Sequence, residues 1–169
     1  MILVDTDILS AMAKIGRIQL LFALLQTPQL HITPGVFGEL AHSFNLRRQY
    51  AVDVFALIAA GQLQIVYLTQ EEAAFRDTLP VTLGAGERES IAIARIRGGT
   101  VLSNESRVAH HCRTHGTPCV RLPDLLRALW VEGIVSQQEV QEIIRDLQVK
   151  DRMQFTQSTL HAIFAHFAE

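Results

Sequence analysis

Short apolar segments alternate with helical segments along the whole chain, and this alternation constrains the fold more than any other feature of the sequence. The apolar segments are residues 2–4, 30–32, 64–67 and 100–103, with an edge strand at 118–120. The first of them, Ile2-Leu3-Val4, is continuously apolar, as strands buried on both faces of a parallel sheet are. Strands that alternate with helices build a parallel sheet with helices on both faces. The sequence therefore predicts an α/β fold: a three-layer α/β/α sandwich with a short, mostly parallel central sheet.

Capping residues and glycines mark the ends of the predicted helices. Thr33 precedes Pro34 as an N-cap followed by proline at the first helical position. Gly61 closes one helix, and Thr69 with the acids that follow it opens the next. The predicted helices cover residues 8–26 with a break at Gly16, a segment from 34 onward, 46–60, 69–80, 87–97, 109–114, 123–133, 137–147 and 159–167.

The size and composition of the chain indicate one folded domain. Its 169 residues are 49% hydrophobic and 19% charged, which provides enough apolar surface for a core and excludes a disordered protein. We expect a single domain over residues 1–169, with the C-terminal helices (about 137–167) packing as an extension. The net charge of -2 gives no indication of a nucleic-acid partner.

The sequence also favours a cytoplasmic location without a membrane partner. Two cysteines cannot form the framework of several disulfides that small secreted domains use. The longest apolar runs, 20–25 and 54–60, are far shorter than the roughly 20 residues of a membrane span. The N-terminus has no basic segment of the kind that begins a signal peptide.

Acidic and amide side chains follow the predicted strands or occupy the first turns of the helices after them. They are Asp5 and Asp7 after the first strand, Asn104 and Glu105 after the strand at 100–103, and Glu39 and Glu87 near helix starts. In a parallel sheet these positions meet at one edge. Clustered carboxylates repel one another unless protons or cations neutralise them, and oxygen ligands favour Mg²⁺ or Mn²⁺ over zinc.

Each glutamate also has a simpler explanation. The helix dipole alone favours an acid in a first turn, and this accounts equally well for Glu39, Glu87, Glu89 or Glu105 taken singly. Asp5 is different, because it ends a buried strand where an acid needs a partner. The acids therefore indicate a metal site as a set.

Three short motifs carry a resemblance to a known family. Val-Asp-Thr-Asp-Ile-Leu at 4–9, Pro-Gly-Val-Phe-Gly-Glu-Leu at 34–40 and Gly-Glu-Arg-Glu-Ser-Ile-Ala-Ile-Ala at 86–94 resemble the first three acidic motifs of PIN-domain nucleases. The Gly-Glu form of the third motif, with Arg-Ala-Leu at 127–129 and Gly-Ile at 133–134, is similar to a subgroup often encoded beside small antitoxins. The order and placement of the motifs make the set more specific than any one of them.

This resemblance implies a Mg²⁺- or Mn²⁺-dependent endoribonuclease that cleaves single-stranded RNA, as the toxin of a toxin-antitoxin pair. Asp5 would be the central metal ligand, with Glu39 and Glu87 as further ligands and Glu89 competing with Glu87 for its role. In the fourth motif Asn104 stands where many relatives have an acid, and Glu105 follows it. The ligand set is thus Asp5, Glu39, Glu87, Glu89 and Asn104, and the catalytic acids are Asp5, Glu39, Glu87 and Glu105.

Several residues would contact the substrate, which for this family is RNA. They are Thr6, Ser103, Arg47, Arg88 and Arg107. Arginine binds phosphate through two parallel hydrogen bonds, although solvated helix faces explain the individual arginines as well. Because Asn104 carries no charge, the alternative function is a catalytically weak or inactive PIN-like module that binds RNA or protein.

Two further features leave alternatives open. His111 and His115 have a spacing that chelates zinc on a helix, but the nearby Cys112 and Cys119 form no Cys-x-x-Cys pair, so ordinary packing is favoured. Apolar stretches at 16–25, 140–147 and 160–167 would bury either a homodimer interface or the interior of the chain itself.

Overall fold

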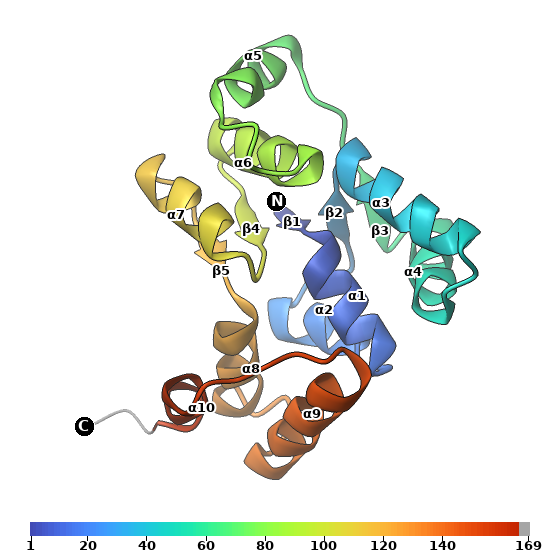
Figure 1. The fold of residues 1–169 in the computed structure, drawn as a ribbon, viewed down its shortest axis with the longest axis vertical. Coiled ribbons are helices and arrows are strands. Elements are labelled where there is room, and N and C mark those ends of the chain that lie inside the picture. The colour runs from blue at the N-terminus through green and yellow to red at the C-terminus, as the bar shows by residue number, and fades with distance from the viewer. Residues whose placement is uncertain (166–169) are drawn as a thin grey trace.

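The computed structural model describes residues 1–165, and its centre is a five-stranded sheet in which every neighbouring pair of strands is parallel (Figure 1). The strand order is β3-β2-β1-β4-β5. The strands are β1 (Ile2–Val4), β2 (Leu30–Ile32), β3 (Leu63–Ile65), β4 (Thr100–Leu102) and β5 (Cys119–Val120). The predicted parallel sheet is confirmed, with residues 119 and 120 forming its edge strand.

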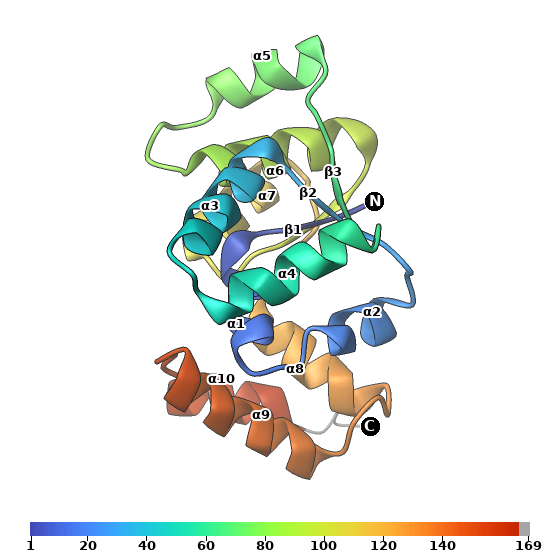
Figure 2. The same cartoon turned by 90° about the vertical axis from the view of Figure 1, so that its right-hand side faces the viewer.

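Helices cover both faces of this sheet. In Figure 2 α5 and α6 lie above the strands, α4 and α1 lie below them, and α9 and α10 form the bottom of the molecule. The helices are α1 (Thr6–Lys14), α2 (Gln19–Leu25), α3 (Pro34–Asn45), α4 (Gln49–Ala59), α5 (Gln70–Thr78), α6 (Ala85–Arg97), α7 (Ser106–Thr114), α8 (Leu122–Val131), α9 (Gln137–Lys150) and α10 (Gln157–Phe164). The predicted three-layer α/β/α sandwich is confirmed.

The side chains of the strands alternate between two hydrophobic clusters. Leu3 and Val101 belong to the cluster beneath α6 and α7, whereas Val4 and Leu102 belong to the larger cluster that includes α1, α4 and α8. All four side chains are fully buried. Both faces of the central strands therefore need apolar residues, which explains why these strands are continuously apolar in the sequence.

The C-terminal helices pack against the rest of the chain. α9 contacts α1 and α8, and α10 contacts α8. Val140, Ile143 and Leu147 of α9 and Ile163 of α10 are buried in the larger cluster. The apolar faces of α9 and α10 are thus used within the chain. The predicted helix at 159–167 is α10, and residues 166 and 167 lie outside the described residues.

The predicted helix at 46–60 is wrong at its start. α3 and α4 meet at a corner over residues 46–48, because Arg47 adopts a left-handed conformation with φ +54° and donates its backbone N–H to Phe44 O at 2.8 Å. α4 therefore begins at Gln49. Smaller differences are that β3 covers 63–65 instead of 64–67, and that α7 begins at Ser106 instead of 109.

Among the described residues, no single helix has the length and apolar character needed to cross a membrane. α1 and α2 reach that length only as a pair, and the pair is bent by 118°.

Candidate active site

The site lies at the carboxyl edge of the sheet, where β1 and β4 end side by side. Val4 and Leu102 are register partners in these parallel strands, so the residues that follow them, Asp5 and Ser103, leave the sheet next to each other. The backbone N–H of Asp5 still donates to Leu102 O at 2.9 Å. Asp5 is only 6% exposed, because it lies at the end of a strand that is buried on both faces. The strand pairing alone thus places a buried carboxylate at this edge.

Both carboxylate oxygens of Asp5 accept hydrogen bonds. Oδ1 accepts from the backbone N–H of Thr6 at 2.8 Å, and Oδ2 accepts from the Ser103 hydroxyl at 2.9 Å. Burial, and after it the charge of Asp7, raise the pKa of Asp5 to about 7, against the opposing effect of the two hydrogen bonds. Asp5 is therefore rigidly held, and a nearby positive charge would strongly stabilise its ionised form.

Asp7 lies in the first turn of α1 and faces the same cleft. Its Oδ1 accepts from the backbone N–H of Ile8 at 2.7 Å, and its Oδ2 accepts from the backbone N–H of Asn104 at 2.8 Å. Burial raises the pKa of Asp7 to about 6. Asp7 follows the first strand, as the sequence predicted, but it is not among the predicted ligands or catalytic acids. Its spacing of two residues from Asp5, directly after a buried strand, was the signal for its role in the site.

Glu87 and Glu89 lie two positions apart on α6 and face different surroundings. Glu87 lines the cleft, and its Oε2 accepts from the backbone N–H of Gly84 at 2.6 Å as part of the cap of α6. Glu89 is 9% exposed, and its Oε2 accepts from the backbone N–H of Gly35 at 2.7 Å, at the start of α3. The structure therefore places Glu87, and not Glu89, at the cleft.

Two glycines bring α3 and α6 together at this point. A Cβ atom on Gly35 would lie 2.5 Å from Gly86 N, and one on Gly86 would lie 2.7 Å from Val36 Cγ2. Contacts this short exclude any side chain, so only glycine allows the two helices to approach this closely. The close approach brings Glu39 of α3 and Glu87 of α6 to the same cleft.

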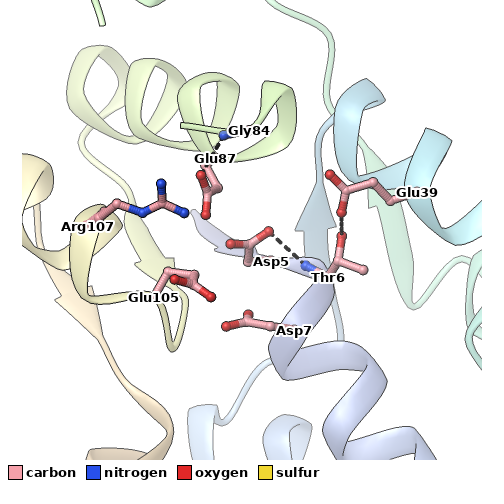
Figure 3. Close-up of a pocket in the computed structure, with 8 residues that line it drawn as sticks. All are labelled: Asp5, Thr6, Asp7, Glu39, Gly84, Glu87, Glu105 and Arg107. Carbon is pink, nitrogen blue, oxygen red and sulfur yellow. Dashed lines mark hydrogen bonds between the residues drawn. The ribbon is translucent and has the colours of Figure 1, made fainter. Parts of the chain in front are cut away.

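The remaining cleft residues come from α1, α3 and α7. Glu39 Oε2 accepts from the Thr6 hydroxyl at 2.5 Å, and Arg107 Nη1 donates to Thr82 O at 2.9 Å. Glu105 is the N-cap residue of α7. In Figure 3 Asp5, Asp7, Glu87 and Glu105 surround one opening, the Arg107 guanidinium extends toward it, and Glu39 is turned toward Thr6.

Together these side chains line a cleft of about 380 Å³ with five carboxylates and one arginine. The lining residues are Asp5, Thr6, Asp7, Glu39, Gly84, Glu87, Glu105 and Arg107. Such a lining attracts cations, and its oxygen donors match the preference of Mg²⁺ and Mn²⁺.

The carboxylates share the cleft without forming a closed coordination shell. Among residues 1–165, no three or more His, Cys, Asp or Glu side chains are close enough together to hold a metal ion as they stand. The neighbouring carboxylates also raise the pKa values of Asp5 and Asp7, although burial is the larger cause for both. The donor set fits a hard divalent cation, and the glutamates would turn toward it on binding.

Five predicted site residues, including Ser103, do not line the cleft. Asn104 meets it through its backbone N–H, which donates to Asp7. Arg47 is exposed at the corner between α3 and α4, and Arg88 on α6 has a buried Nε without a hydrogen-bond partner among the described residues. Glu89 is the fourth. Of the predicted substrate contacts, Thr6 and Arg107 line the cleft, and Ser103 lies buried behind Asp5.

Comparison with known proteins identifies the family. No curated protein matches the chain. A family model described as a PIN domain matches residues 1–169, which is the whole chain. The parallel sheet and the acidic cleft at its carboxyl edge agree with this match. The chain therefore belongs to the PIN domain family.

Proposed function

We propose that this protein is a metal-dependent endoribonuclease that hydrolyses phosphodiester bonds of single-stranded RNA in the acidic cleft. PIN domains are generally nucleases and typically use divalent metal ions. One observation carries the proposal: carboxylates from four separate segments, including Asp5, Glu39, Glu87 and Glu105, line a single cleft. The acids would have no reason to converge there unless a cation neutralised them.

In this proposal Asp5 is the central ligand of Mg²⁺ or Mn²⁺, and Asp7, Glu39, Glu87 and Glu105 complete the acidic set. The bound ion would lower the pKa of a water molecule and stabilise the negative charge that develops on the phosphate. Asp5 needs little reorganisation, because both of its oxygens are already oriented by hydrogen bonds.

Arg107 is the residue that we assign to phosphate binding. Its Nη1 donates to Thr82 O, which fixes the guanidinium at the rim, while the rest of the group extends toward the carboxylates (Figure 3). A positive charge at the edge of an acidic cleft would hold a phosphate oxygen and reduce the repulsion between the RNA backbone and the acids. Thr6 lies on the other side of Asp5 from Arg107 (Figure 3), and its hydroxyl orients Glu39.

The position of Glu105 favours catalysis over the inactive binding module. Asn104 contributes only a backbone N–H to the site, whereas Glu105, the next residue, lines the cleft. The fourth motif thus supplies a negative charge even though its first position carries an amide. We therefore assign Glu105 to the catalytic acids and leave Asn104 and Glu89 out of the ligand set.

We also propose that the enzyme acts in the cytoplasm as the toxin of a toxin-antitoxin pair, bound by an antitoxin protein or by a second copy of the chain. The support is the resemblance of its third motif, Gly86-Glu87, to that subgroup. Phe44, Leu46 and Val52 are exposed at the corner between α3 and α4 and are the residues that we propose for contact with such a partner. A neighbouring reading frame for a short DNA-binding protein would support this role.

A cleavage assay tests the nuclease proposal. Purified protein is incubated with end-labelled single-stranded RNA in Mn²⁺, in Mg²⁺ and in EDTA, with single-stranded DNA of the same sequence as a second substrate. We expect internal RNA fragments with either metal and none in EDTA. Asp5→Asn should abolish cleavage, whereas Asp53→Asn should not, because Asp53 is an exposed acid on α4 that bonds to Gln49 outside the cleft.

Three results would contradict the proposal. Cleavage that persists in Asp5→Asn would place the chemistry elsewhere. RNA that is bound but never cut under any metal would establish the binding module instead. Cleavage of DNA but not of RNA would support a nuclease and contradict the assignment of RNA as its substrate.

A further inference from the structure

The two cysteines of the chain lie on neighbouring elements behind the cleft. Cys112, on the inner face of α7, is fully buried, and Cys119 is half-buried in β5. Both belong to the hydrophobic cluster between the sheet and the layer of α6 and α7. Cys119 is the register partner of Val101, whose side chain is in that same cluster. Both thiols therefore pack in the same layer, between α7 and the edge of the sheet.

The turn between α7 and β5 fixes this arrangement. Gly116 has a φ of +67°, and the backbone N–H of Thr117 donates to Cys112 O at 2.8 Å, so the chain reverses directly below the end of α7. α7 then packs on β5, the strand that the turn leads into. A bond between the two sulfurs would close only this short loop, and it would join two elements that are already in contact.

The surroundings make the two thiols chemically unequal. The pKa of the Cys119 thiol is lowered, because the neighbouring Cys112 thiol donates to its sulfur and Arg121 adds a positive charge nearby. The same contact and burial raise the pKa of Cys112. Such a pair combines a half-buried, more acidic thiol with a fully buried partner that can react in a second step.

We propose that Cys112 and Cys119 form a redox-active dithiol, which a hydroperoxide such as hydrogen peroxide oxidises to an intramolecular disulfide. The Cys119 thiolate attacks the O–O bond, which breaks to give a sulfenic acid on Cys119 and hydroxide. The sulfur of Cys112 then attacks the oxidised sulfur, the S–S bond forms, and the sulfenic oxygen leaves as water with the proton of Cys112. The two sulfurs together lose two electrons, which reduce the peroxide.

The dithiol is connected to the cleft through Ser103. The backbone N–H of Ser103 donates to the carbonyl of Val120, the residue after Cys119, at 3.3 Å, while the Ser103 hydroxyl orients Asp5. Arg121, the residue after β5, donates to Asn104 O at 3.1 Å. Oxidation at β5 would therefore alter the segment that holds Asp5 and Asp7. This connection rests on the proposed function, whereas the formation of the disulfide does not.

Intact-mass measurement of the full-length protein tests the dithiol. Reduced protein is treated with equimolar hydrogen peroxide and denatured, and its free thiols are counted with and without dithiothreitol. We expect the mass to fall by two hydrogen atoms, both thiols to disappear, and dithiothreitol to restore both. Peptide mapping should find the fragments containing Cys112 and Cys119 joined within one chain.

Two single substitutions assign the roles. Cys112→Ser should stop at a sulfenic acid on Cys119, trapped by dimedone, whereas Cys119→Ser should lose its remaining thiol about tenfold more slowly because Cys112 is buried and protonated. Cys112→Ala replaces Cys112→Ser if the buried hydroxyl prevents folding, as judged by thermal melting.

The proposal is wrong if the wild-type protein keeps both thiols under conditions that oxidise free cysteine, if it gains oxygen without losing its thiols pairwise, or if disulfides form only between chains. If the disulfide forms but leaves the Mn²⁺-induced rise in melting temperature unchanged, the connection to the cleft is overturned. An absent Mn²⁺ response in the reduced protein would instead count against the proposed metal site alone.

Discussion

The acids of the cleft fall into two groups that are held in different ways. The inner pair, Asp5 and Asp7, is largely buried, and each of its four oxygens accepts a hydrogen bond. Of the outer acids, Glu87 and Glu105 come from helix starts and Glu39, contrary to the prediction of a first-turn position, comes from the second turn of α3. All three are less buried and have few fixed contacts. The inner pair is preorganised at an electrostatic cost, while the outer acids are free to move toward a cation. Metal binding would relieve the repulsion in the first group and order the second.

The largest expected effect comes from neutralising the inner pair. Asp5→Asn should lower the rate of RNA cleavage by about a thousandfold, since several kcal/mol of charge stabilisation depends on the central ligand. Glu105→Gln, in the outer group, should cost much less. Single-turnover rates at saturating Mn²⁺ measure both. Equal losses in the two variants would show that the two groups are equivalent.

The inner pair should also make the metal-free protein less stable as the pH rises. The pKa of Asp5 is raised to about 7 in the folded state from 3.8, so between about pH 4 and 7 the folded state binds more protons than the unfolded state. The free energy of unfolding then falls as the pH increases through this window. The fall is about 1.4 kcal/mol for each unit by which the pKa of the folded state exceeds that of the unfolded state. The raised pKa of Asp7 acts in the same direction.

Urea denaturation in EDTA at a series of pH values measures this effect. Asp5→Asn should show a weaker decline and should be more stable than the wild type above pH 7. Profiles that run parallel in the two proteins would mean that Asp5 is not the source of the dependence.

The hydrogen bond behind Asp5 is expected to have an intermediate effect. Ser103→Ala should lower cleavage by about 10- to 100-fold, because residues that orient a metal ligand typically contribute that much. Ser90→Ala is the matched control: Ser90 is equally buried on α6, but its hydroxyl has no partner among the described residues. The cleavage rate and the Mn²⁺ affinity of each variant distinguish lost orientation of Asp5 from disturbed packing. A similar loss in both would indicate disturbed packing instead of lost orientation.

The smallest effect separates the two glutamates of α6. Glu89→Ala should lower the free energy of unfolding by about 1–3 kcal/mol, because the buried N–H of Gly35 loses its acceptor. Glu87→Gln should leave stability unchanged and reduce the Mn²⁺-induced rise in melting temperature. Thermal melts with and without Mn²⁺ distinguish them. The reverse pattern would restore Glu89 as the ligand.

The alternation of strands with helices and the edge of the sheet at which the acids gather were predictable from the sequence. Apolar runs and the residues directly after them are local features, and Asp5 follows from them alone. The choice between Glu87 and Glu89 was not predictable, because it depends on how α6 is rotated against α3. Asn104 misled the prediction for a related reason: its contribution is a backbone N–H, which every residue except proline has.

The glycine contact between α3 and α6 limits how this cleft can diversify. A methyl group on Gly35 would collide with the backbone of Gly86, and one on Gly86 would collide with Val36, so neither position can be altered alone without forcing the two helices apart. Mutant libraries aimed at new substrate preferences should keep both glycines. Variation aimed at substrate preference belongs at positions of the same helices outside this contact.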